Sequence, residues 1–516
     1  MSAAARRRPP VLLVVPALLA ASVAVVPIWY LVDRALGQGW AEVVDEVWRR
    51  RTLDLLARSL ALAGVVTVLC VVVGVTAAWL VVRSDLPGRR VLQVLLALPL
   101  AVPSYLSAFA WVSWRSWLAG FRGATLVLVL VSYPFVYLPA VAALRHLDPA
   151  HEEIARSLGR SRLDIALRLT LRQIRPAVAA GALLVALYVL SDFGAVATMR
   201  YEVFTWVIYG AYRAGFNPSR AAILALVLIA IALVLVAAEA RARGRATAAR
   251  LGSGSARQGA AVRLGRATPL AWLFVAAVLG AGVGFPVYRI VYWVTTFTST
   301  EVDGGEVASA LGQTLFLAVL AAVVAIAFAI PVGVLAARFR SGTSIAVERS
   351  TYVAHALPGI VVAISLVFVG VRLLRPVYQE VPLLVLGYVV LFLPLAVGAV
   401  RASVEQSPVR LEEVARSLGS SPRAVFTRIT GPLALPGISA GAALVFLSTM
   451  KELPVTLVLR PTGTETLATR LWHHTAVSDY ANAAPYALAL VIFAAVPTAL
   501  LSGALAWRRE GTTAHD

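Results

Sequence analysis

Two carboxylates occupy equivalent places in two copies of one apolar pattern. Asp192 is the centre of Leu190-Ser-Asp-Phe-Gly194, and Glu452 is the centre of Met450-Lys-Glu-Leu-Pro454, 260 residues later. Carboxylates within apolar spans are costly and usually face a protein interior or an aqueous path. The pair therefore indicates a candidate translocation path lined by Asp192 and Glu452. The structural alternative is that Asp192 caps a helix break before Gly194, while Glu452 pairs with neighbouring polar groups.

A polar, charged segment also occurs twice. Glu152-Glu-Ile-Ala-Arg-Ser-Leu-Gly159 returns 260 residues later as Glu412-Glu-Val-Ala-Arg-Ser-Leu-Gly419, and only Ile154 and Val414 differ. The flanking apolar segments diverge, so near identity in this segment predicts two surfaces for two identical partners. The alternative is an ordinary amphipathic helix that lies at a membrane interface.

Each copy of the polar segment has the features of a short helix with defined ends. In both, a glutamate precedes an arginine by four residues, in the order that favours an ion pair: Glu152 with Arg156, and Glu412 with Arg416. Gly159 and Gly419 suit the left-handed conformation that ends a helix. Side-chain caps are expected at the start of this helix and of a second one that follows it, from Asp148, Ser407, Ser161 and Ser421.

The composition places these segments in a membrane protein. Of the 516 residues, 60% are hydrophobic and only 14% are charged. A net charge of +20 would suggest nucleic acid as the partner of a soluble protein. Here the basic residues cluster in alternate loops, as the positive-inside rule predicts, so we expect a lipid bilayer and no nucleic acid. Cys70 is the only cysteine, which excludes an intramolecular disulfide and a cysteine-cluster metal site.

Hydropathy predicts an all-α polytopic protein with about twelve transmembrane helices. Six spans are expected near 11–32, 56–82, 91–117, 124–145, 176–198 and 220–239, and six more near 270–294, 312–337, 352–374, 382–401, 436–458 and 484–507. Residues 1–240 and 269–510 then form two six-helix repeats, joined by a basic cytoplasmic linker over 241–268. Six spans separate the two polar loops, 148–176 and 407–436, so both face the cytoplasm, as do both termini.

Further matches extend the repeat beyond the polar loops. They pair Leu98-Pro99 with Leu357-Pro358, Tyr137-Leu-Pro139 with Phe392-Leu-Pro394, Pro176 with Pro436, and Gly181 with Gly441. Parallel repeats related by an axis along the membrane normal are one known plan for transporters.

At the polar loops the chain resembles the permease subunits of ABC importers, and the resemblance spans essentially the whole chain. The matching residues are Glu153, Ala155, Gly159 and Pro176 in the first copy, and Glu413, Ala415, Gly419, Leu435 and Pro436 in the second. The resemblance implies two parallel MetI-like permease repeats in a bacterial inner membrane. It also implies that the loops, including Glu152 and Glu412, form coupling helices that dock into two ATP-binding cassette subunits. An extracytoplasmic binding protein would deliver the substrate.

The chain lacks the means to hydrolyse ATP. A phosphate-binding P-loop needs a lysine followed by serine or threonine after a glycine-rich turn. Lys451 is the only lysine, and it stands between Met450 and Glu452. We therefore expect no catalytic residues and no cofactor on this chain, with ATP and magnesium bound by its partners.

The cargo is suggested by the segments around the two carboxylates. Residues 191–194 with 201–212, and 451–456 with 459–470, are similar to the ferric iron branch of the permease family, and a hard cation prefers oxygen ligands. An ammonium-bearing substrate would also suit carboxylates. The same machinery could instead carry thiamine, polyamine, sulfate or phosphonate, and an ion-coupled secondary transporter is an alternative of another class. His473 and His474 lack the spacing of a metal site, and we expect them to be loop residues.

Overall fold

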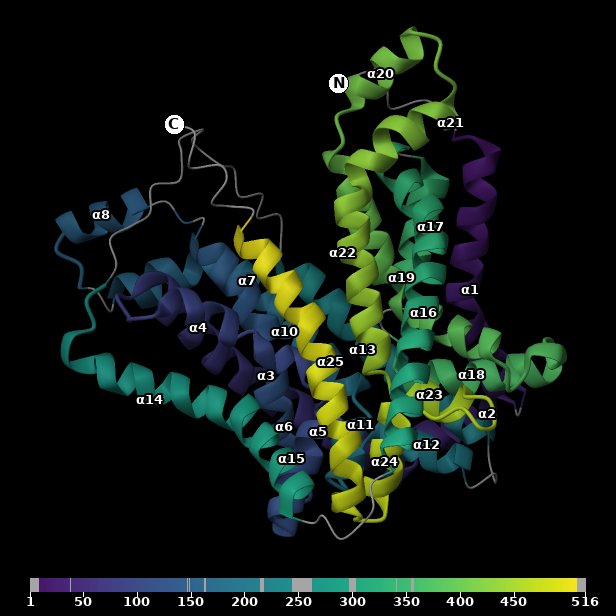
Figure 1. Ribbon diagram of the computed structural model, residues 1–516, viewed down its shortest axis with the longest axis horizontal. Helices are drawn as coiled ribbons and strands as arrows, with labels where there is room; N and C mark the ends of the chain where they lie inside the picture. The colour runs from purple at the N-terminus through teal and green to yellow at the C-terminus, as the bar shows by residue number, and fades with distance from the viewer. Residues whose placement is uncertain are drawn as a thin grey trace.

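A computed structural model describes residues 9–37, 39–145, 147, 149–161, 164–213, 218–243, 262–296, 303–339, 341–353 and 357–507. Helices make up nearly all of this described part (Figure 1). Its single β-type pairing is an isolated bridge between Ser84 and Val262. The predicted all-α fold is therefore confirmed.

Twelve helices or helix pairs of the described residues lie where the sequence predicts the twelve spans. In the first half they are α1 (Val11–Leu36), α3 (Arg50–Arg83), the pair α4 (Arg89–Leu95) and α5 (Ser104–Trp114), the pair α6 (Phe121–Ser132) and α7 (Pro134–Arg145), α10 (Leu171–Ser191) and α13 (Pro218–Arg243). In the second half they are the pair α14 (Thr268–Leu279) and α15 (Phe285–Thr296), α16 (Gly304–Arg338), the pair α17 (Gly342–Val353) and α18 (Gly359–Arg372), α19 (Val381–Gln406), α22 (Gly431–Met450) and α25 (Tyr480–Trp507). Nine helices or helix runs within the described residues pass a length-and-hydropathy test for spanning a membrane, and α4 with α5 forms a tenth, bent span.

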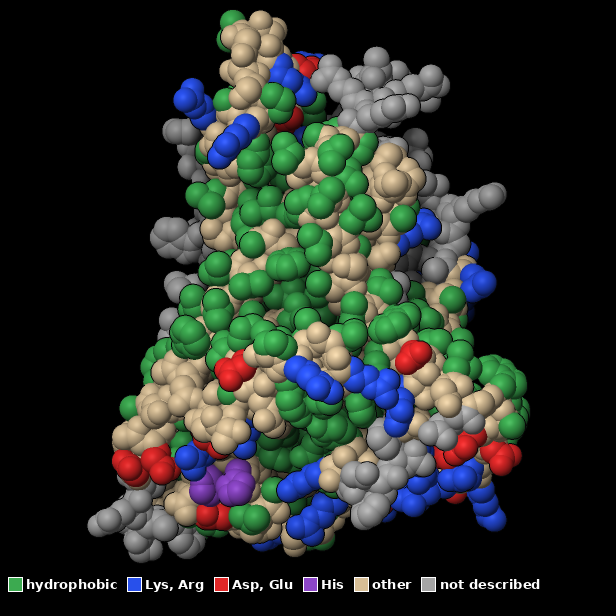
Figure 2. Space-filling view, turned by 90° about the vertical axis from the view of Figure 1, so that its right-hand side faces the viewer, with side chains coloured by type: hydrophobic (Ala, Val, Ile, Leu, Met, Phe, Trp, Pro, Cys, Tyr) green, Lys and Arg blue, Asp and Glu red, His purple; other side chains and the backbone are tan. Residues whose placement is uncertain are grey.

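The outer surface of these helices matches a lipid environment. Figure 2 shows hydrophobic side chains over the middle of one face, with most charged side chains nearer its two ends. Val234 on α13 and Val323 on α16 are 65% and 62% exposed although they lie in the most apolar spans. Such exposure is favourable in hydrocarbon and unfavourable in water, so this surface is the one that contacts the bilayer.

The first helix of each half packs on the other half. Helix α1 contacts α16, α17 and α18 of the second half, and α15 contacts α5 of the first (Figure 1). Arg289 on α15 donates a hydrogen bond from Nη2 to the Ser113 carbonyl near the end of α5, at 3.1 Å. This exchange of helices ties the two halves together and was not predicted from hydropathy.

The two halves meet at one end of the molecule and diverge toward the other (Figure 1). The polar-loop helices α8 (Pro149–Ser157) and α20 (Val409–Ser417) stand apart at the open end, and the short helices α12 (Phe204–Arg213) and α24 (Leu467–Ala476) lie at the closed end. One buried apolar cluster at the closed end draws on both halves, with Phe193 near Trp472 (ring centroids 5.3 Å apart) and Phe109 near Tyr480 (5.7 Å).

The two glycines predicted to be equivalent, Gly181 and Gly441, each lie where two helices approach closely. A Cβ on Gly181 of α10 would lie 2.6 Å from the Phe135 carbonyl oxygen on α7, and a Cβ on Gly441 of α22 would lie 2.5 Å from Ala399 Cβ on α19. Each distance is below any ordinary carbon contact, so only glycine allows these helix pairs to approach so closely.

Within the described residues, nine of the predicted spans coincide with helices or helix runs that are long and apolar enough to cross a membrane, and three of the twelve predicted spans are interrupted. The span expected over 91–117 bends by 87° between the η2 turn (Leu98–Ala101) and α5. The spans expected over 176–198 and 436–458 stop at Ser191 and Met450, before the short helices α11 (Gly194–Thr198) and α23 (Pro454–Leu459). Hydropathy alone missed these breaks because the residues after each one are also apolar.

One predicted equivalence is wrong. Pro103 and Pro358, not Pro99 and Pro358, occupy the same place, because each is the N-cap of its helix, with φ and ψ of −60° and 141° before α5 and −61° and 144° before α18. Equivalent residues of the two halves are therefore 255 residues apart in this region, whereas the predicted pair Pro99 and Pro358 is 259 residues apart. The offset becomes 260 only at the polar loops, because α19 continues to Gln406 whereas α7 ends at Arg145.

Candidate functional site

Helices α8 and α20 are nine residues long and end in the same way. Gly159 has φ of +77° and Gly419 has φ of +84°, the left-handed conformation predicted for both. In α20 the amide of Ser420 donates to the Ala415 carbonyl at 3.0 Å, and in α8 the amide of Arg160 donates to the Ala155 carbonyl at 3.1 Å. This six-to-one bond is the Schellman arrangement, so sequence identity in the two loops becomes identity of backbone geometry.

Glu412 fixes α20 to two transmembrane helices. Arg338, the last residue of α16, donates to Glu412 Oε1 from Nε at 3.0 Å and from Nη2 at 2.6 Å. Thr430, just before α22, donates its hydroxyl to the same oxygen at 3.0 Å. The side chains of Arg338 and Glu412 are 13% and 10% exposed, so the ion pair is largely shielded from water. Such shielded, charge-assisted bonds are stronger than surface pairs.

Glu152 makes the same contacts in the first half. Arg83, the last residue of α3, donates from Nη2 to Glu152 Oε1 at 2.9 Å, and Thr170 donates its hydroxyl to that oxygen at 3.0 Å. We call each group of arginine, glutamate and threonine an anchor. The anchors link the polar-loop helix to the end of one transmembrane helix and to the beginning of another.

The next residues in each loop helix face away from the transmembrane helices. Glu153 and Glu413 are exposed, and neither side chain makes an ion pair or hydrogen bond within the described residues. Their apolar neighbours are also open to solvent: Ile154 and Leu158 are 59% and 76% exposed, and Val414 and Leu418 are 56% and 80% exposed. These four residues form the apolar loop face. Ala155 and Ala415 lie on the opposite, more buried side.

The predicted helix ends and ion pairs of the loops are confirmed only in part. Ser161 and Ser421 accept hydrogen bonds from the amides of Asp164 and Ala424, at 3.1 and 3.3 Å, as expected of caps. The predicted Ser407 cap is wrong: its hydroxyl is buried without a partner among the described residues, and Pro408 is the N-cap of α20. Asp148 lies outside the described residues.

The ion pair predicted within each loop helix differs between the copies. Arg156 lies 4.0 Å from Glu152, at the limit of an ion pair. Arg416 instead donates to the Glu412 backbone carbonyl at 3.1 Å, and the described residues contain no Arg416–Glu412 ion pair. The anchoring arginines differ as well, because Arg338 donates to the Glu412 carboxylate from two nitrogens, whereas Arg83 donates to Glu152 from one.

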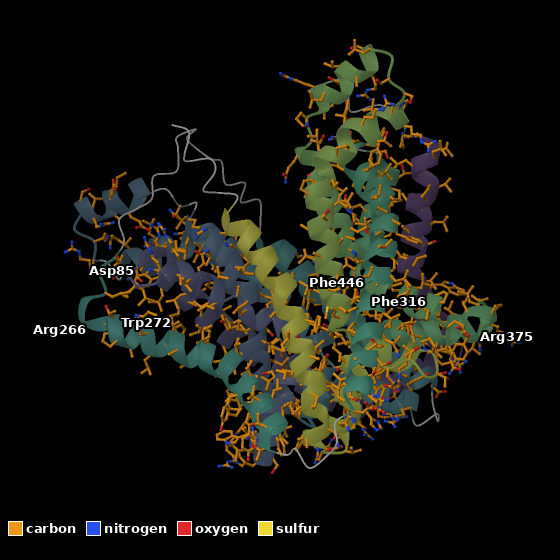
Figure 3. All side chains as sticks on the ribbon, in the orientation of Figure 1. Asp85, Arg266, Trp272, Phe316, Arg375 and Phe446 are labelled. Carbon is orange, nitrogen blue, oxygen red and sulfur yellow. The ribbon has the colours of Figure 1, made fainter. Side chains whose placement is uncertain are left out.

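The end of the segment between the halves is attached to the first anchor. The amide of Val262 donates to the Arg83 carbonyl at 2.7 Å, and the amide of Asp85 donates to the Val262 carbonyl at 3.1 Å. Asp85 Oδ1 then accepts from the Leu264 amide at 2.9 Å. Figure 3 shows Asp85 close to Arg266 at the edge of the first half. Residues 244–261, most of the predicted linker, lie outside the described residues.

Asp192 lies at the break between α10 and α11 and is 7% exposed. Its Oδ1 accepts hydrogen bonds from the amides of Ala195 and Val196, at 2.9 and 3.4 Å, and its Oδ2 accepts from the Ser104 hydroxyl at 2.5 Å. The carboxylate therefore caps α11 and joins it to the first residue of α5. This geometry is that of the structural alternative, and a role in a translocation path stays a prediction.

Glu452 takes the equivalent place between α22 and α23 and is 8% exposed. Its Oε1 accepts from the Val455 amide at 3.0 Å, and its Oε2 accepts from the amide and hydroxyl of Thr456, at 3.1 and 3.2 Å. A Cβ on Gly359, the first residue of α18, would lie 2.8 Å from Glu452 Oε1. The longer acid thus occupies the space that the Ser104 side chain fills in the first half.

The residue before Glu452 crosses between the halves. Lys451 Nζ donates to the Leu100 carbonyl in the η2 turn of the first half, at 3.0 Å. Ser191 is the equivalent residue in the first half, and within the described part of the chain its hydroxyl donates only to the Tyr188 carbonyl of its own helix, at 3.0 Å. The junction between the halves is therefore asymmetric at this position.

His473 and His474 lie in the last turn of α24, so the expectation that they are loop residues is wrong. His474 Nδ1 is 3.0 Å from Asp479 Oδ2, which also accepts from the Asn482 amide group at 2.8 Å. Burial raises the pKa of Asp479, but the hydrogen bonds from Asn482 and His474 together outweigh it and hold that pKa below its usual range. The described residues contain no group of three or more side chains suited to a metal ion.

Comparison with known proteins identifies the family. A family model described as binding-protein-dependent transport system inner membrane component matches residues 70–241 and, separately, residues 329–508. The chain belongs to this permease family. Each matched segment contains one anchor glutamate and one capping carboxylate, so the permease carries the family domain twice. It is a multi-pass inner membrane protein and a transport component.

Two kinds of relative resemble this permease. The Fe(3+)-transport system permease protein FbpB 2 of Haemophilus influenzae is 35% identical over 479 residues, which cover 92% of this chain and 95% of the relative. The sulfate transport system permease protein CysT of Escherichia coli is 26% identical over 226 residues, covering 40% of this chain and 82% of the relative. The sulfate transport system permease protein CysW of Synechocystis is 27% identical over 229 residues, covering 40% and 83%.

Matching the two repeats by sequence missed four residues of the anchors: Arg83, Arg338, Thr170 and Thr430. The two threonines follow the 260-residue offset of the polar loops, but the arginines are 255 residues apart. An arginine at the end of an apolar span is also common in any membrane protein. A comparison that allowed the offset to change between the spans and the loops would have paired the two arginines.

Proposed function

We propose that this permease is the transmembrane subunit of an ATP-driven importer of ferric iron. Two ATP-binding cassette subunits would dock on α8 and α20 from the cytoplasm, and an extracytoplasmic binding protein would deliver iron to the closed end. Both termini would then be cytoplasmic. Residues 1–240 and 269–510 would form the two permease repeats, joined by a cytoplasmic linker over 241–268.

The duplicated loop helices carry the proposal. Each presents an exposed glutamate and an exposed apolar pair, Ile154 with Leu158 or Val414 with Leu418, at the end of the molecule where the halves diverge. Exposed apolar residues on a helix that lies beyond the apolar spans favour a protein partner. Identical caps and anchors favour two copies of the same partner, with Glu153, Ala155, Gly159, Glu413, Ala415 and Gly419 in the coupling segments.

The anchors supply the mechanism. When the ATP-binding subunits close on ATP, they would draw α8 and α20 toward each other. Glu152 and Glu412 would transmit that movement to α3 and α16 through Arg83 and Arg338. The halves would then converge at the cytoplasmic end and separate at the closed end, which switches the access of the path.

Iron as the cargo is supported by the relative from Haemophilus influenzae, which aligns along nearly the whole of both chains. Sulfate is the second candidate, because sulfate permeases resemble about 40% of the chain. Asp192 and Glu452 are candidate path residues, and their caps at the helix breaks would have to loosen before they could contact cargo.

The test uses the complex purified from its native membrane by a tag on this chain. An ATP-binding cassette protein should copurify in two copies per chain, and proteoliposomes should take up ⁵⁵Fe³⁺ only with ATP and the binding protein present. Replacing Gly159 and Gly419 together with valine should leave ATP hydrolysis but abolish uptake, because a β-branched residue is strained at positive φ while its Cβ meets nothing within 4 Å. Uptake without an ATP-binding partner, or normal uptake by the double variant, would refute the proposal.

A further inference from the structure

The charges at the junction between the two halves do not favour a bare cation. The carboxylates of Asp192 and Glu452 are each occupied by hydrogen bonds from the start of a short helix. Bonds from backbone amides, together with the partial positive charge at a helix start, offset much of the charge of a carboxylate. The two capped carboxylates therefore attract a passing cation less strongly than two free carboxylates would.

Lys451 is a charged side chain at the junction whose charge is not offset in this way. Its ammonium group is partly buried, and its hydrogen bond to the Leu100 carbonyl crosses from one half to the other. It makes no ion pair with any carboxylate within the described residues, although Glu452 is its neighbour in sequence. The backbone carbonyl satisfies one of the three ammonium hydrogens and does not neutralise the charge.

The residue type at this position also departs from the rest of the chain. All other basic residues are arginine, and Ser191 is the equivalent of Lys451 in the first half. Lysine offers a compact charge with hydrogens that can turn toward a new acceptor, whereas arginine offers a planar fork. A lone, movable ammonium at the junction of the halves is suited to meet an oxyanion.

We propose that Lys451 is an anion contact in the translocation path, so that the cargo passes the junction with an oxyanion group attached. This inference rests on the proposed import function and specifies its substrate class. The oxyanion could be a carboxylate ligand that travels on ferric iron, or a free inorganic oxyanion such as sulfate. In either case the ammonium leaves the Leu100 carbonyl for the cargo when the junction opens.

The structural alternative is that Lys451 only links the two halves through Leu100, and two substitutions separate these roles. Lys451→Gln keeps a hydrogen-bond donor for the Leu100 carbonyl but removes the charge, and Lys451→Arg keeps the charge. An anion contact predicts that Lys451→Gln lowers uptake at least 10-fold and that Lys451→Arg stays within about threefold of wild type. A link between the halves predicts that Lys451→Gln behaves as wild type. Ser191→Ala is the matched control and should leave uptake unchanged.

The assay compares the variant complexes, with their ATP-binding subunits and binding protein, in proteoliposomes. One arm supplies ⁵⁵Fe³⁺ with ¹⁴C-citrate, and a second supplies ³⁵S-sulfate. Entry of ¹⁴C with ⁵⁵Fe identifies an anionic ligand on iron, and entry of ³⁵S identifies a free oxyanion. Thermal unfolding of each complex is measured in parallel.

The expected result is a loss of uptake in Lys451→Gln with an unchanged melting temperature. Normal uptake by this variant, loss in Lys451→Arg as well, or a loss accompanied by a lower melting temperature would each overturn the inference. So would entry of ⁵⁵Fe without either anion. If the wild-type complex shows no ATP-driven uptake in any arm, the proposed function fails and this inference fails with it.

Discussion

The two neighbouring glutamates of the second loop helix should have effects of very different size when each is replaced by alanine. Glu412 is bonded to Arg338 and Thr430, whereas Glu413 is exposed and has no partner among the described residues. Glu412→Ala should therefore loosen α20 from the transmembrane helices. Glu413→Ala should leave α20 in place and affect only the surface offered to a partner.

The magnitude follows from the contacts. Removing one member of a buried ion pair costs about 3–5 kcal/mol. The cost here lies near the lower limit, because Arg338 would keep its bond to the Ser407 carbonyl, at 3.0 Å. A loss of about 3 kcal/mol corresponds to roughly a 100-fold change in an opening equilibrium. For Glu413, loss of a helix-dipole interaction is worth less than about 1 kcal/mol, or roughly fivefold.

Hydrogen–deuterium exchange of the protein in nanodiscs measures this difference directly. The amides of α20 should exchange about 100-fold faster in Glu412→Ala than in wild type, because their protection depends on how often the helix opens. Glu413→Ala is the matched control, with the same change one residue away. Equal loss of protection in both variants, or none in either, would refute the anchor role of Glu412.

Two further predictions concern the junction and the loop helices. Gly359→Ser should destabilise the protein by about 1–3 kcal/mol, because the new Cβ would lie 2.8 Å from Glu452 Oε1. Adding Glu452→Asp, which shortens the acid, should recover at least about 1 kcal/mol, as measured by a double-mutant cycle of urea unfolding. If the free-energy changes of the two substitutions simply add, the side chains at positions 359 and 452 do not compete for the same space. Spin labels on cysteines at Leu158 and Leu418, in a Cys70→Ala background, should approach each other when ATP binds the assembled complex. An unchanged distance would argue against convergence of the loop helices.

The number and place of the spans could be predicted because hydropathy over about 20 residues depends on local sequence alone. The exchange of α1 and α15 between the halves could not, since it depends on which apolar surfaces pack together. The same limit applies to the anchors. Nothing in the sequence of α16 distinguishes Arg338 from any other arginine at the end of a span, and its partner Glu412 is 74 residues away.

The loop segments were the most predictable part of the site because their geometry is local. The left-handed conformation of Gly159 and Gly419 follows from residue type and position within five residues. The internal ion pair expected between Glu412 and Arg416 is absent from the described residues, where Arg338 of a distant helix pairs with the carboxylate instead. Local pattern predicts backbone shape well and side-chain partners poorly wherever a distant charge competes.

The two capping carboxylates show what duplication has preserved in this chain. The first half joins a short acid, Asp192, to the hydroxyl of Ser104, and the second half fits a longer acid, Glu452, beside Gly359. The acid and its neighbour fill a similar space in the two halves although the residue types differ. What the two halves have in common is a carboxylate that caps the short helix after the break. Because hydrogen bonds from the helix starts occupy both carboxylates, we expect the selection of cargo to depend on positions where the two halves differ. Lys451, opposite the carbonyl of Leu100, is such a position.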